Sequence, residues 1–196
     1  MKFHSMTDKE LIEGILNKNQ ATFKILVDKY QSLVLNTCNS FLHNKTFSED
    51  VTQEVFIEVF LSIHKFKKEA KLSTWLYRIS VNKSLNFIRD NKKNNLFKSI
   101  ENFFLGEGNQ ELQISDNEHE TSENEAIQKE RIELLHQSIN ALSKNQKVAF
   151  TLHKMEDLSY KQISEVMNLS LSSVEGLIHR AKINVQREIL SFYKKK

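Results

Sequence analysis

The sequence predicts an all-α protein made of two small helical domains. Its 196 residues include no proline and only four glycines, so the residues that make hairpin turns and interrupt helices are nearly absent. Apolar residues recur at helical spacing on both sides of an acidic stretch that lacks such spacing. We therefore expect two helical domains, residues 1–93 and 129–196, joined by an acidic flexible linker at 94–128.

The first domain should contain four helices. Their apolar spacing places them at about 8–16, 20–42, 48–66 and 73–92. The single cysteine, Cys38, cannot form an internal disulfide and lies among apolar residues on the second helix. We expect it only to pack in the core, as free cysteine commonly does.

Charge is unevenly distributed along the chain. Basic residues outnumber acidic ones by five in residues 1–95 and again by five in 131–196, whereas acidic residues are in excess by seven in 96–130. Two basic ends suggest two surfaces that face a polyanion, although ordinary solubilising charge explains the same distribution. The stretch at 94–128 also holds two glycines and many Asn, Glu and Ser residues, which is typical of a linker.

The second domain should contain four helices that begin with capping boxes. In this pattern a hydroxyl residue precedes the helix and Glu or Gln follows three residues later. The third helix should be only about two turns long, and a very short link should separate it from the fourth. The four pairs are Ser122/Glu125, Ser143/Gln146, Ser159/Gln162 and Ser172/Glu175.

The short third helix and the fourth helix have the pattern of a helix–turn–helix. Ser164 is small where the two helices would cross, and Asn168 suits a turn with positive φ. Leu169 should fill the angle between the helices. The residues expected to face inward are Ile163, Met167, Val174 and Leu177. A corner of a helical bundle is the alternative, but it requires neither the short helix nor the small residue.

A helix–turn–helix places the outer face of its second helix in the DNA major groove. Lys182 and Arg187 are better placed for phosphates than for bases. Gly176 lowers helix propensity, which is reasonable where the backbone approaches DNA closely. The residues expected to face the groove are Ser172, Ser173, Glu175, Gly176, His179 and Arg180.

Two further surfaces are expected on the first domain. Polar residues at steps of three and four form a stripe along the fourth helix, namely Arg78, Asn82, Asn86, Arg89 and Lys93. This stripe is either a solvated face or a nucleic-acid contact, and its asparagines favour the latter. The preceding helix carries an acidic strip, formed by Asp50, Gln53, Glu54 and Glu58, that should not touch DNA.

These residues together resemble the bacterial RNA polymerase sigma factors of the sigma-70 family, specifically the compact extracytoplasmic-function (ECF) group. The resemblance covers nearly the whole chain except the linker. Four segments carry it in the family's order: ATFKILVDKYQSLV, SEDVTQEVFIEVFLSIHKF, KLSTWLYRISVNKSLNFIRD and LSYKQISEVMNLSLSSVEGLIHRAK. It implies a first domain, region 2, that binds core polymerase and opens the promoter, and a second domain, region 4, that reads the upstream promoter element.

The resemblance also implies roles for particular residues. Asp50, Gln53, Glu54 and Ile57 match the helix that docks on the clamp helices of the largest polymerase subunit. The residues that match the helix contacting the minus-ten element are Arg78, Asn82, Lys83, Asn86 and Arg89. Those that match the helix contacting the minus-thirty-five element are Ser172, Ser173, Glu175, Gly176, His179, Arg180 and Lys182. Many relatives carry a basic residue where this chain has Glu175, so their promoter preference does not transfer.

The expected partners are core polymerase, promoter DNA and an anti-sigma factor, with no cofactor, no small-molecule substrate and no direct membrane insertion. A cytoplasmic location is expected, because the start of the chain has no apolar signal segment. A catalytic or metal site is not expected, since one cysteine and one Glu-x-x-His pair are too few for zinc or di-metal chemistry. The alternative function is a free-standing helix–turn–helix regulator, which would bind its duplex without polymerase.

Overall fold

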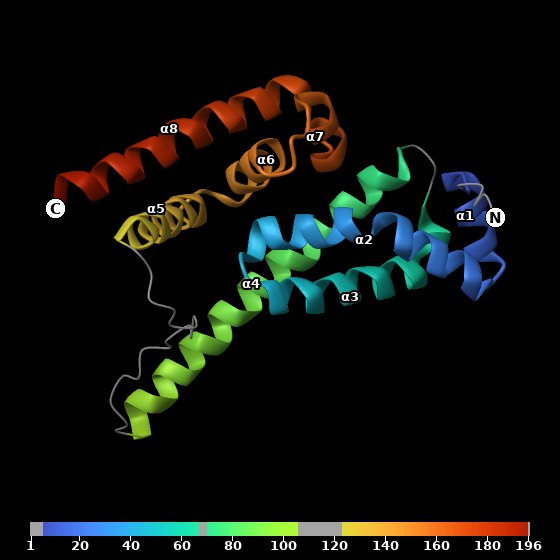
Figure 1. The fold of residues 1–196 in the computed structure, drawn as a ribbon, viewed down its shortest axis with the longest axis horizontal. Coiled ribbons are helices and arrows are strands. Elements are labelled where there is room, and N and C mark those ends of the chain that lie inside the picture. The colour runs from blue at the N-terminus through green and yellow to red at the C-terminus, as the bar shows by residue number, and fades with distance from the viewer. Residues whose placement is uncertain (1–5, 67–69, 106–122, 196) are drawn as a thin grey trace. The chain divides into compact units, whose positions relative to one another are not determined.

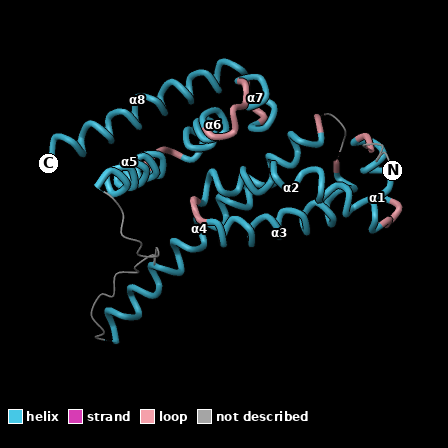
Figure 2. The backbone as a smooth tube through the Cα atoms, in the orientation of Figure 1, coloured by secondary structure: helices cyan, strands magenta, loops and turns pink. Residues whose placement is uncertain are grey.

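The computed structural model describes residues 6–66, 70–105 and 123–195, and within these ranges it is helical throughout with no strand (Figures 1 and 2). The described residues group into two compact units. One is drawn from Met1–Ile88 and Thr151–Val174, and the other from Arg89–Phe150 and Glu175–Lys196. The expectation of an all-α fold is confirmed for this part of the chain.

Two helices begin the chain as the sequence predicted. α1 spans Asp8–Leu16 and α2 spans Gln20–Leu42. Thr7 caps α1 with a complete capping box, in which Glu10 accepts a hydrogen bond from the Thr7 backbone N–H. That box was missed in the sequence. Gly14 is required where α1 approaches α2, because a Cβ atom there would lie 2.6 Å from the Thr22 side chain.

The next helices differ from prediction in their bounds. α3 spans Lys45–Ser62, followed by the short 3₁₀ helix η1 at Ile63–Lys65, and α4 spans Leu72–Leu105. α3 begins three residues earlier than expected because Asn44 caps it, accepting a hydrogen bond from the Phe47 backbone N–H at 3.0 Å. The expectation that the fourth helix ends near residue 92 was wrong, since α4 continues to Leu105 and so enters the range expected to be linker.

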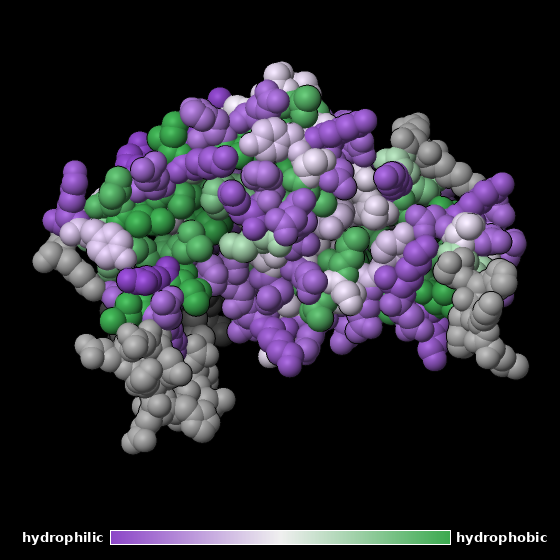
Figure 3. Space-filling model, turned by 45° about the horizontal axis from the view of Figure 1, so that its top comes forward, coloured by the Kyte–Doolittle hydropathy of each residue, from purple (hydrophilic) through white to green (hydrophobic). Residues whose placement is uncertain are grey.

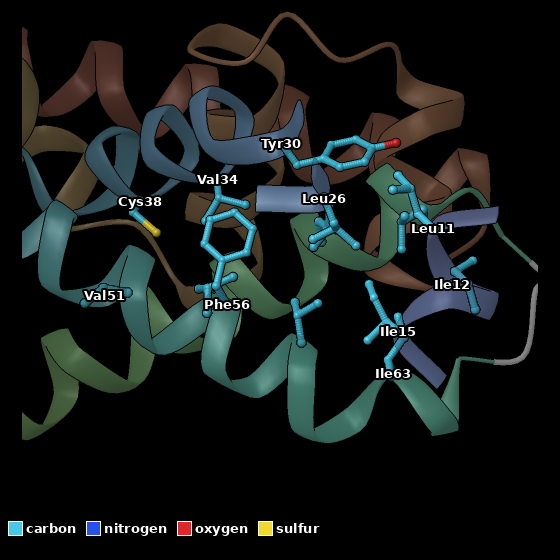
Figure 4. Packing of buried hydrophobic residues seen from close by; sticks show 14 residues of the cluster. Leu11, Ile12, Ile15, Leu26, Tyr30, Val34, Cys38, Val51, Phe56 and Ile63 are labelled. Atoms are coloured by element: carbon cyan, nitrogen blue, oxygen red, sulfur yellow. The ribbon is translucent and has the colours of Figure 1, made fainter. Parts of the chain in front are cut away.

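The helices α1, α2, α3 and α4 share one hydrophobic core in the first unit (Figure 4). Phe56 and Val34 face each other near its centre, and Cys38 lies beside them, fully buried. Burial raises the pKa of the Cys38 thiol, so the residue packs as a neutral apolar group, as predicted. At one edge the Tyr30 hydroxyl donates a hydrogen bond to Asp8 at 2.7 Å, which fixes α1 on α2. Other members of the core are Leu11, Leu26, Val51, Val55, Val59, Leu72 and Leu76.

Four helices follow in the C-terminal part. They are α5 (Glu123–Asn140), α6 (Lys144–Lys154), α7 (Tyr160–Met167) and α8 (Leu171–Lys195). α5 begins within the range expected to be linker. A second core cluster joins residues of α5, α6 and α8, together with Leu142: Ile139, Leu142, Phe150, Ala181 and Val185. A hydrogen bond of 3.1 Å from the Asn184 amide to Gln146 adds a polar tie between α6 and α8.

The turns between helices use positive-φ residues other than glycine. Lys18 (φ 59°) follows α1, His43 (φ 52°) ends α2, Asp157 (φ 51°) lies between α6 and α7, and Asn168 (φ 53°) ends α7. In a chain with four glycines and no proline, these residues supply the left-handed backbone that such turns require. Among the described residues, no helix has the length and apolar character needed to cross a bilayer.

Candidate protein-docking and DNA-binding surfaces

The acidic strip lies on the solvent face of α3. Asp50, Gln53, Glu54 and Ile57 are all exposed, whereas the residues on the opposite side of the helix, such as Val55 and Val59, are fully buried. α3 is held from behind by the core, so these four side chains are free to meet another molecule. The family resemblance assigned these four residues to a docking helix, and all four are exposed on α3.

Phe60 and Leu61 extend this surface beyond Ile57, and both were missed in the sequence as part of it. Leu61 is 63% exposed and Ile57 is 59% exposed, and the two lie one helical turn apart. Phe60 is also exposed, at 45%, with its ring edge-on to Phe23 at a centroid distance of 5.1 Å. The four-residue spacing from Ile57 to Leu61 was the available signal. A face that mixes exposed apolar side chains with carboxylates is typical of a protein-docking surface.

Lys83 links α4 to the acidic strip. Its Nζ lies 3.8 Å from Oε2 of Glu54 and 3.8 Å from Oε2 of Glu58, and its side chain is only 29% exposed. The sequence assigned Lys83 to the minus-ten contact, on the strength of the resemblance alone. In the structure its ammonium group faces carboxylates on the neighbouring helix.

The polar stripe of α4 is divided between exposed and half-buried positions. Asn82, Asn86 and Arg89 are exposed and recur at steps of four and three, so they share one face of the helix. Arg89 donates a hydrogen bond to Asp90 at 3.0 Å, and that contact raises the pKa of its guanidinium. Arg78 is half-buried. Lys93 lies outside the residues whose side chains are described.

Trp75 packs rather than standing free as a stacking platform. It is half-buried against the core of the first unit, and its ring lies 5.3 Å from that of Phe66. Leu72, which is buried, begins the helix on which Trp75 lies.

The helix–turn–helix is built by local capping. The Ser159 hydroxyl accepts from the Gln162 backbone N–H while Gln162 accepts from the Ser159 backbone N–H, which completes the predicted capping box of α7. Asn168 ends α7 with φ 53° and ψ 48°, as expected for the left-handed turn residue. The expectation that Leu169 fills the angle between the helices was wrong, because this side chain is 37% exposed.

The inward-facing residues of the motif differ slightly from prediction. Ile163 and Val174 are fully buried as expected. Met167 and Leu177 are only half-buried, whereas Val166 and Ile178 are buried in their place. In each helix the buried residue is therefore one position away from the residue that the sequence pattern predicted.

The start of α8 is capped by Ser170 rather than by Ser172. The Ser173 backbone N–H donates to the Ser170 hydroxyl at 3.2 Å, and Ser172 lies inside the helix. The predicted box of Ser172 with Glu175 is therefore wrong. The carboxylate of Glu175 is exposed and does not take part in capping, since the residue three positions after the cap is Ser173.

The outer face of α8 presents the predicted groove residues to solvent. Ser172, Ser173, Glu175, His179, Arg180 and Lys182 are exposed. Gly176 lies among them, and a Cβ atom at this position would come within 3.3 Å of the Arg180 guanidinium. The missing side chain at 176 therefore leaves room for Arg180 to lie along the helix surface. Among the residues that the structure describes, no group of three or more His, Cys, Asp or Glu side chains could hold a metal ion.

The fold and these surfaces define an all-α protein of the helix–turn–helix class. Comparison with known proteins specifies it further, because residues 26–94 match the sigma-70 region 2 model and residues 132–185 match a sigma-70 region 4 model. The ECF RNA polymerase sigma-E factor of Haemophilus influenzae is 30% identical over 189 residues, which cover 94% of this chain and 96% of the relative. The chain belongs to the sigma-70 family, in its ECF group.

Other relatives agree. The RNA polymerase sigma-H factor of Pseudomonas aeruginosa is 29% identical over 184 residues, covering 93% of each chain. Among solved structures, CnrH in complex with the cytosolic domain of CnrY has a TM-score of 0.63 at 19% identity, over 94% of this chain and 97% of that one. The sigma factor RpoE of Bartonella quintana in complex with the anti-sigma factor NepR has a TM-score of 0.56 at 16% identity, over 85% and 96%.

Proposed function

We propose that the exposed face of α3 docks this sigma factor on core RNA polymerase, while α4 and α8 contact promoter DNA. As an ECF member of the sigma-70 family, the chain is a transcription initiation factor that directs RNA polymerase to promoters. Its work is binding and recognition, and we assign it no enzymatic role. It acts in the cytoplasm, where polymerase and promoter DNA are present.

The docking proposal rests on one observation, the exposure of Asp50, Gln53, Glu54 and Ile57 on a helix whose other face is buried. Carboxylates on this strip would repel the phosphates of DNA, so its partner is a protein surface. Charge complementarity would steer the encounter with a basic partner, and burial of Ile57 would add apolar contact. The family resemblance supports the clamp helices of the largest polymerase subunit as that partner.

The minus-ten proposal uses α4, which contacts α3 through Lys83. Asn82, Asn86 and Arg89 on the exposed face of α4 are candidates for contact with the opened strand, together with Arg78 and Lys83. Amide side chains can address base edges, and single-stranded bases expose those edges once they leave the stack. Extruding a base costs a few kcal/mol, which a rigid helix backed by a packed core is suited to offset.

The minus-thirty-five proposal uses α8 as a recognition helix in the major groove. Glu175, His179 and Arg180 are candidates for base contacts, with Gly176 allowing close approach. Ser172, Ser173 and Lys182 are candidates for the phosphate backbone or for bases near the start of the helix. Neither promoter contact alone needs to be strong, because two sites on one tethered complex raise each other's effective concentration.

An anti-sigma factor is the further partner that we propose. One solved structure of the same fold is the sigma factor RpoE in complex with the anti-sigma factor NepR, and another is CnrH in complex with the cytosolic domain of CnrY. The free-standing regulator considered from the sequence is not supported, because it explains neither the match to region 2 nor the exposed acidic face of α3. A regulator of that kind would also bind its duplex as an isolated protein, which the experiment below distinguishes.

The test is co-elution of the purified protein with bacterial core RNA polymerase on size-exclusion chromatography. Glu54→Lys and Gln53→Ala should reduce complex formation, and Glu54→Lys should do so by at least tenfold because it opposes the charge of the partner. Asp28→Lys is the matched control, since it makes the same change of charge at an exposed position of α2. Unchanged binding by Glu54→Lys, or equal loss in Asp28→Lys, would contradict the docking proposal. Binding of duplex DNA by the protein alone, without binding to core, would restore the regulator.

A further inference from the structure

One apolar side chain is exposed at the start of α8, where its neighbours are polar. Leu171 is the first residue of the helix and is 49% exposed. Ser170 precedes it and Ser172 and Ser173 follow it, and all three are exposed. Apolar patches stand out in green on the mainly hydrophilic surface in Figure 3. Single exposed leucines are common on protein surfaces, so the place of Leu171 in the fold carries the argument, rather than its exposure.

Leu171 lies where a recognition helix meets base edges. In a helix–turn–helix, the N-terminal residues of the second helix contact bases in the major groove. Leu171 also precedes Glu175 by four residues, so the two side chains lie on one side of α8. Glu175 is exposed and is a candidate for base contact. Leu171 therefore belongs to the surface that α8 presents to DNA, and this inference rests on the function proposed for α8.

The serines around Leu171 bond with one another. The Ser170 hydroxyl lies 3.2 Å from that of Ser172 and 2.7 Å from that of Ser173. It also accepts a hydrogen bond of 3.2 Å from the Ser173 backbone N–H. These bonds cap the helix and use part of the hydrogen-bonding capacity of its first turn. The first turn therefore offers DNA an apolar side chain beside hydroxyl groups that are already partly satisfied.

The major groove presents one apolar target to such a side chain. The C5 methyl group of thymine projects into it, whereas the other groups that distinguish the base pairs there are hydrogen-bond donors and acceptors. Leucine placed against a donor or acceptor would remove water from it without replacing the lost hydrogen bond, which is unfavourable. Leucine placed against a thymine methyl group buries apolar surface on both sides. Burial of one methyl-sized group raises affinity about fourfold.

A protein partner is the other occupant to consider for this side chain. Apolar docking surfaces are contiguous patches of a few hundred Å² or more. Leu171 is instead flanked by hydroxyl groups, with the Glu175 carboxylate one turn further along the helix. Leu169 is exposed nearby, at 37%, but it lies in the turn before α8. A single leucine among polar groups suits one methyl group better than it suits an apolar protein surface.

We propose that Leu171 is a specificity-determining residue of α8 that contacts the C5 methyl group of a thymine in the minus-thirty-five element. The holoenzyme should therefore favour an A·T pair at one position of the element. Glu175, His179 and Arg180 would recognise bases through hydrogen bonds, whereas Leu171 recognises a methyl group. The contact thus adds a base preference of a different chemical kind to the same helix.

The test uses holoenzyme assembled from the full chain and bacterial core polymerase. Promoter duplexes with a randomised minus-thirty-five region are first selected by binding, which identifies the preferred element. Each thymine of that element, on either strand, is then replaced singly by deoxyuridine, which removes the C5 methyl group and keeps every hydrogen-bonding group of the base. We expect one replacement to weaken binding of labelled promoter about fourfold, measured by fluorescence anisotropy.

Variants assign the effect of uracil to Leu171. Leu171→Ala holoenzyme should bind the thymine promoter about fourfold more weakly, and the uracil replacement should then have no further effect. Leu16→Ala is the matched control, because it makes the same substitution at a leucine of α1 that is 47% exposed. It should keep the full effect of uracil. Both positions are exposed, so both variants should retain the helical circular-dichroism signal.

Three results would overturn the proposal. These are a selected element in which no uracil replacement weakens binding, a uracil effect that survives Leu171→Ala, and a uracil effect that is lost in Leu169→Ala but not in Leu171→Ala. With any of them, a sequence preference in the randomised region would still support the function proposed for α8. Absence of any preference there would contradict both proposals. Unchanged promoter binding by Leu171→Ala would also overturn this one, and would assign the side chain to a protein contact.

Discussion

Lys83 on α4 and Glu54 on α3 form an ion pair with 3.8 Å between Nζ and Oε2, and Lys83 makes a second contact of the same length with Glu58. One cation of the proposed promoter-binding helix therefore lies against the proposed polymerase-docking strip. Pairs between partly exposed charges contribute roughly 0–1 kcal/mol to stability. Their larger effect here is on the position of the Glu54 carboxylate.

The first prediction concerns this pair. Lys83→Met should weaken binding to core polymerase by up to about 1 kcal/mol, because Glu54 loses the partner that orients it. The same substitution made in a Glu54→Gln, Glu58→Gln background should have no further effect on core affinity. Titration of labelled core with the four proteins gives the double-mutant cycle. Additive effects of the substitutions would show that Lys83 acts independently of the strip, and its role in DNA contact would then stand alone.

The second prediction concerns the exposed asparagines of α4. Asn82→Ala and Asn86→Ala should leave core binding unchanged, because neither residue belongs to the proposed docking strip. Each should reduce promoter opening by holoenzyme by about 1–3 kcal/mol, the usual contribution of an amide to base recognition. Permanganate reactivity of unpaired thymines in the promoter measures the opening. Normal opening by both variants would transfer the minus-ten contact to other residues of α4.

The third prediction concerns Gly176. Gly176→Ala should stabilise the isolated protein by about 0.5–1 kcal/mol, because alanine favours the helix over glycine. The new Cβ would lie 3.3 Å from the Arg180 guanidinium and would push that side chain from its position along the helix. Thermal denaturation of the protein should therefore show a higher Tm, while binding of the holoenzyme to a promoter with a minus-thirty-five element weakens. A higher Tm with undiminished DNA binding would show that neither Gly176 nor the position of Arg180 matters for recognition.

The fourth prediction concerns pH. Burial lowers the pKa of His136 on α5, and although Glu133 opposes this, Lys147 adds to the lowering. As pH falls below the ordinary histidine pKa of about 6.5, the unfolded chain takes up a proton that the folded chain resists, so stability decreases. His136→Gln should flatten the decline of Tm between about pH 7 and pH 5. An unchanged decline of Tm in His136→Gln would contradict this prediction.

The fold could be predicted from the sequence where local chemistry decides it. The bounds of α1 and α2 and the capping box of Ser159 follow from side chains within a few residues of the helix ends. Asn168 was identified as a left-handed turn residue for the same reason. The family resemblance placed the docking strip, and helical periodicity alone put its members on one face.

Features that depend on longer-range or ambiguous signals were not predictable. The continuation of α4 to Leu105 was not predicted, because the segment after residue 90 is rich in Asn and Lys. Such a composition is typical of a linker, although it is also compatible with a helix. Ser170 and Ser172 both lie near the start of α8, and the capping-box pattern selected Ser172, although Ser170 is the cap. The contact of Lys83 with Glu54 joins two helices, so no spacing within one segment reveals it.

The turns that join the helices also lower the free energy of unfolding, because residues other than glycine adopt positive φ there. Lys18, His43 and Asp157 hold left-handed backbone angles that cost an L-amino acid about 1–2 kcal/mol each. Glycine adopts the same angles without that cost. The stability gained by removing the strain exceeds the entropic cost of the greater freedom that glycine gives the unfolded chain. Glycine at these three turn positions should therefore give a more heat-resistant form of this factor without altering a residue of α3, α4 or α8.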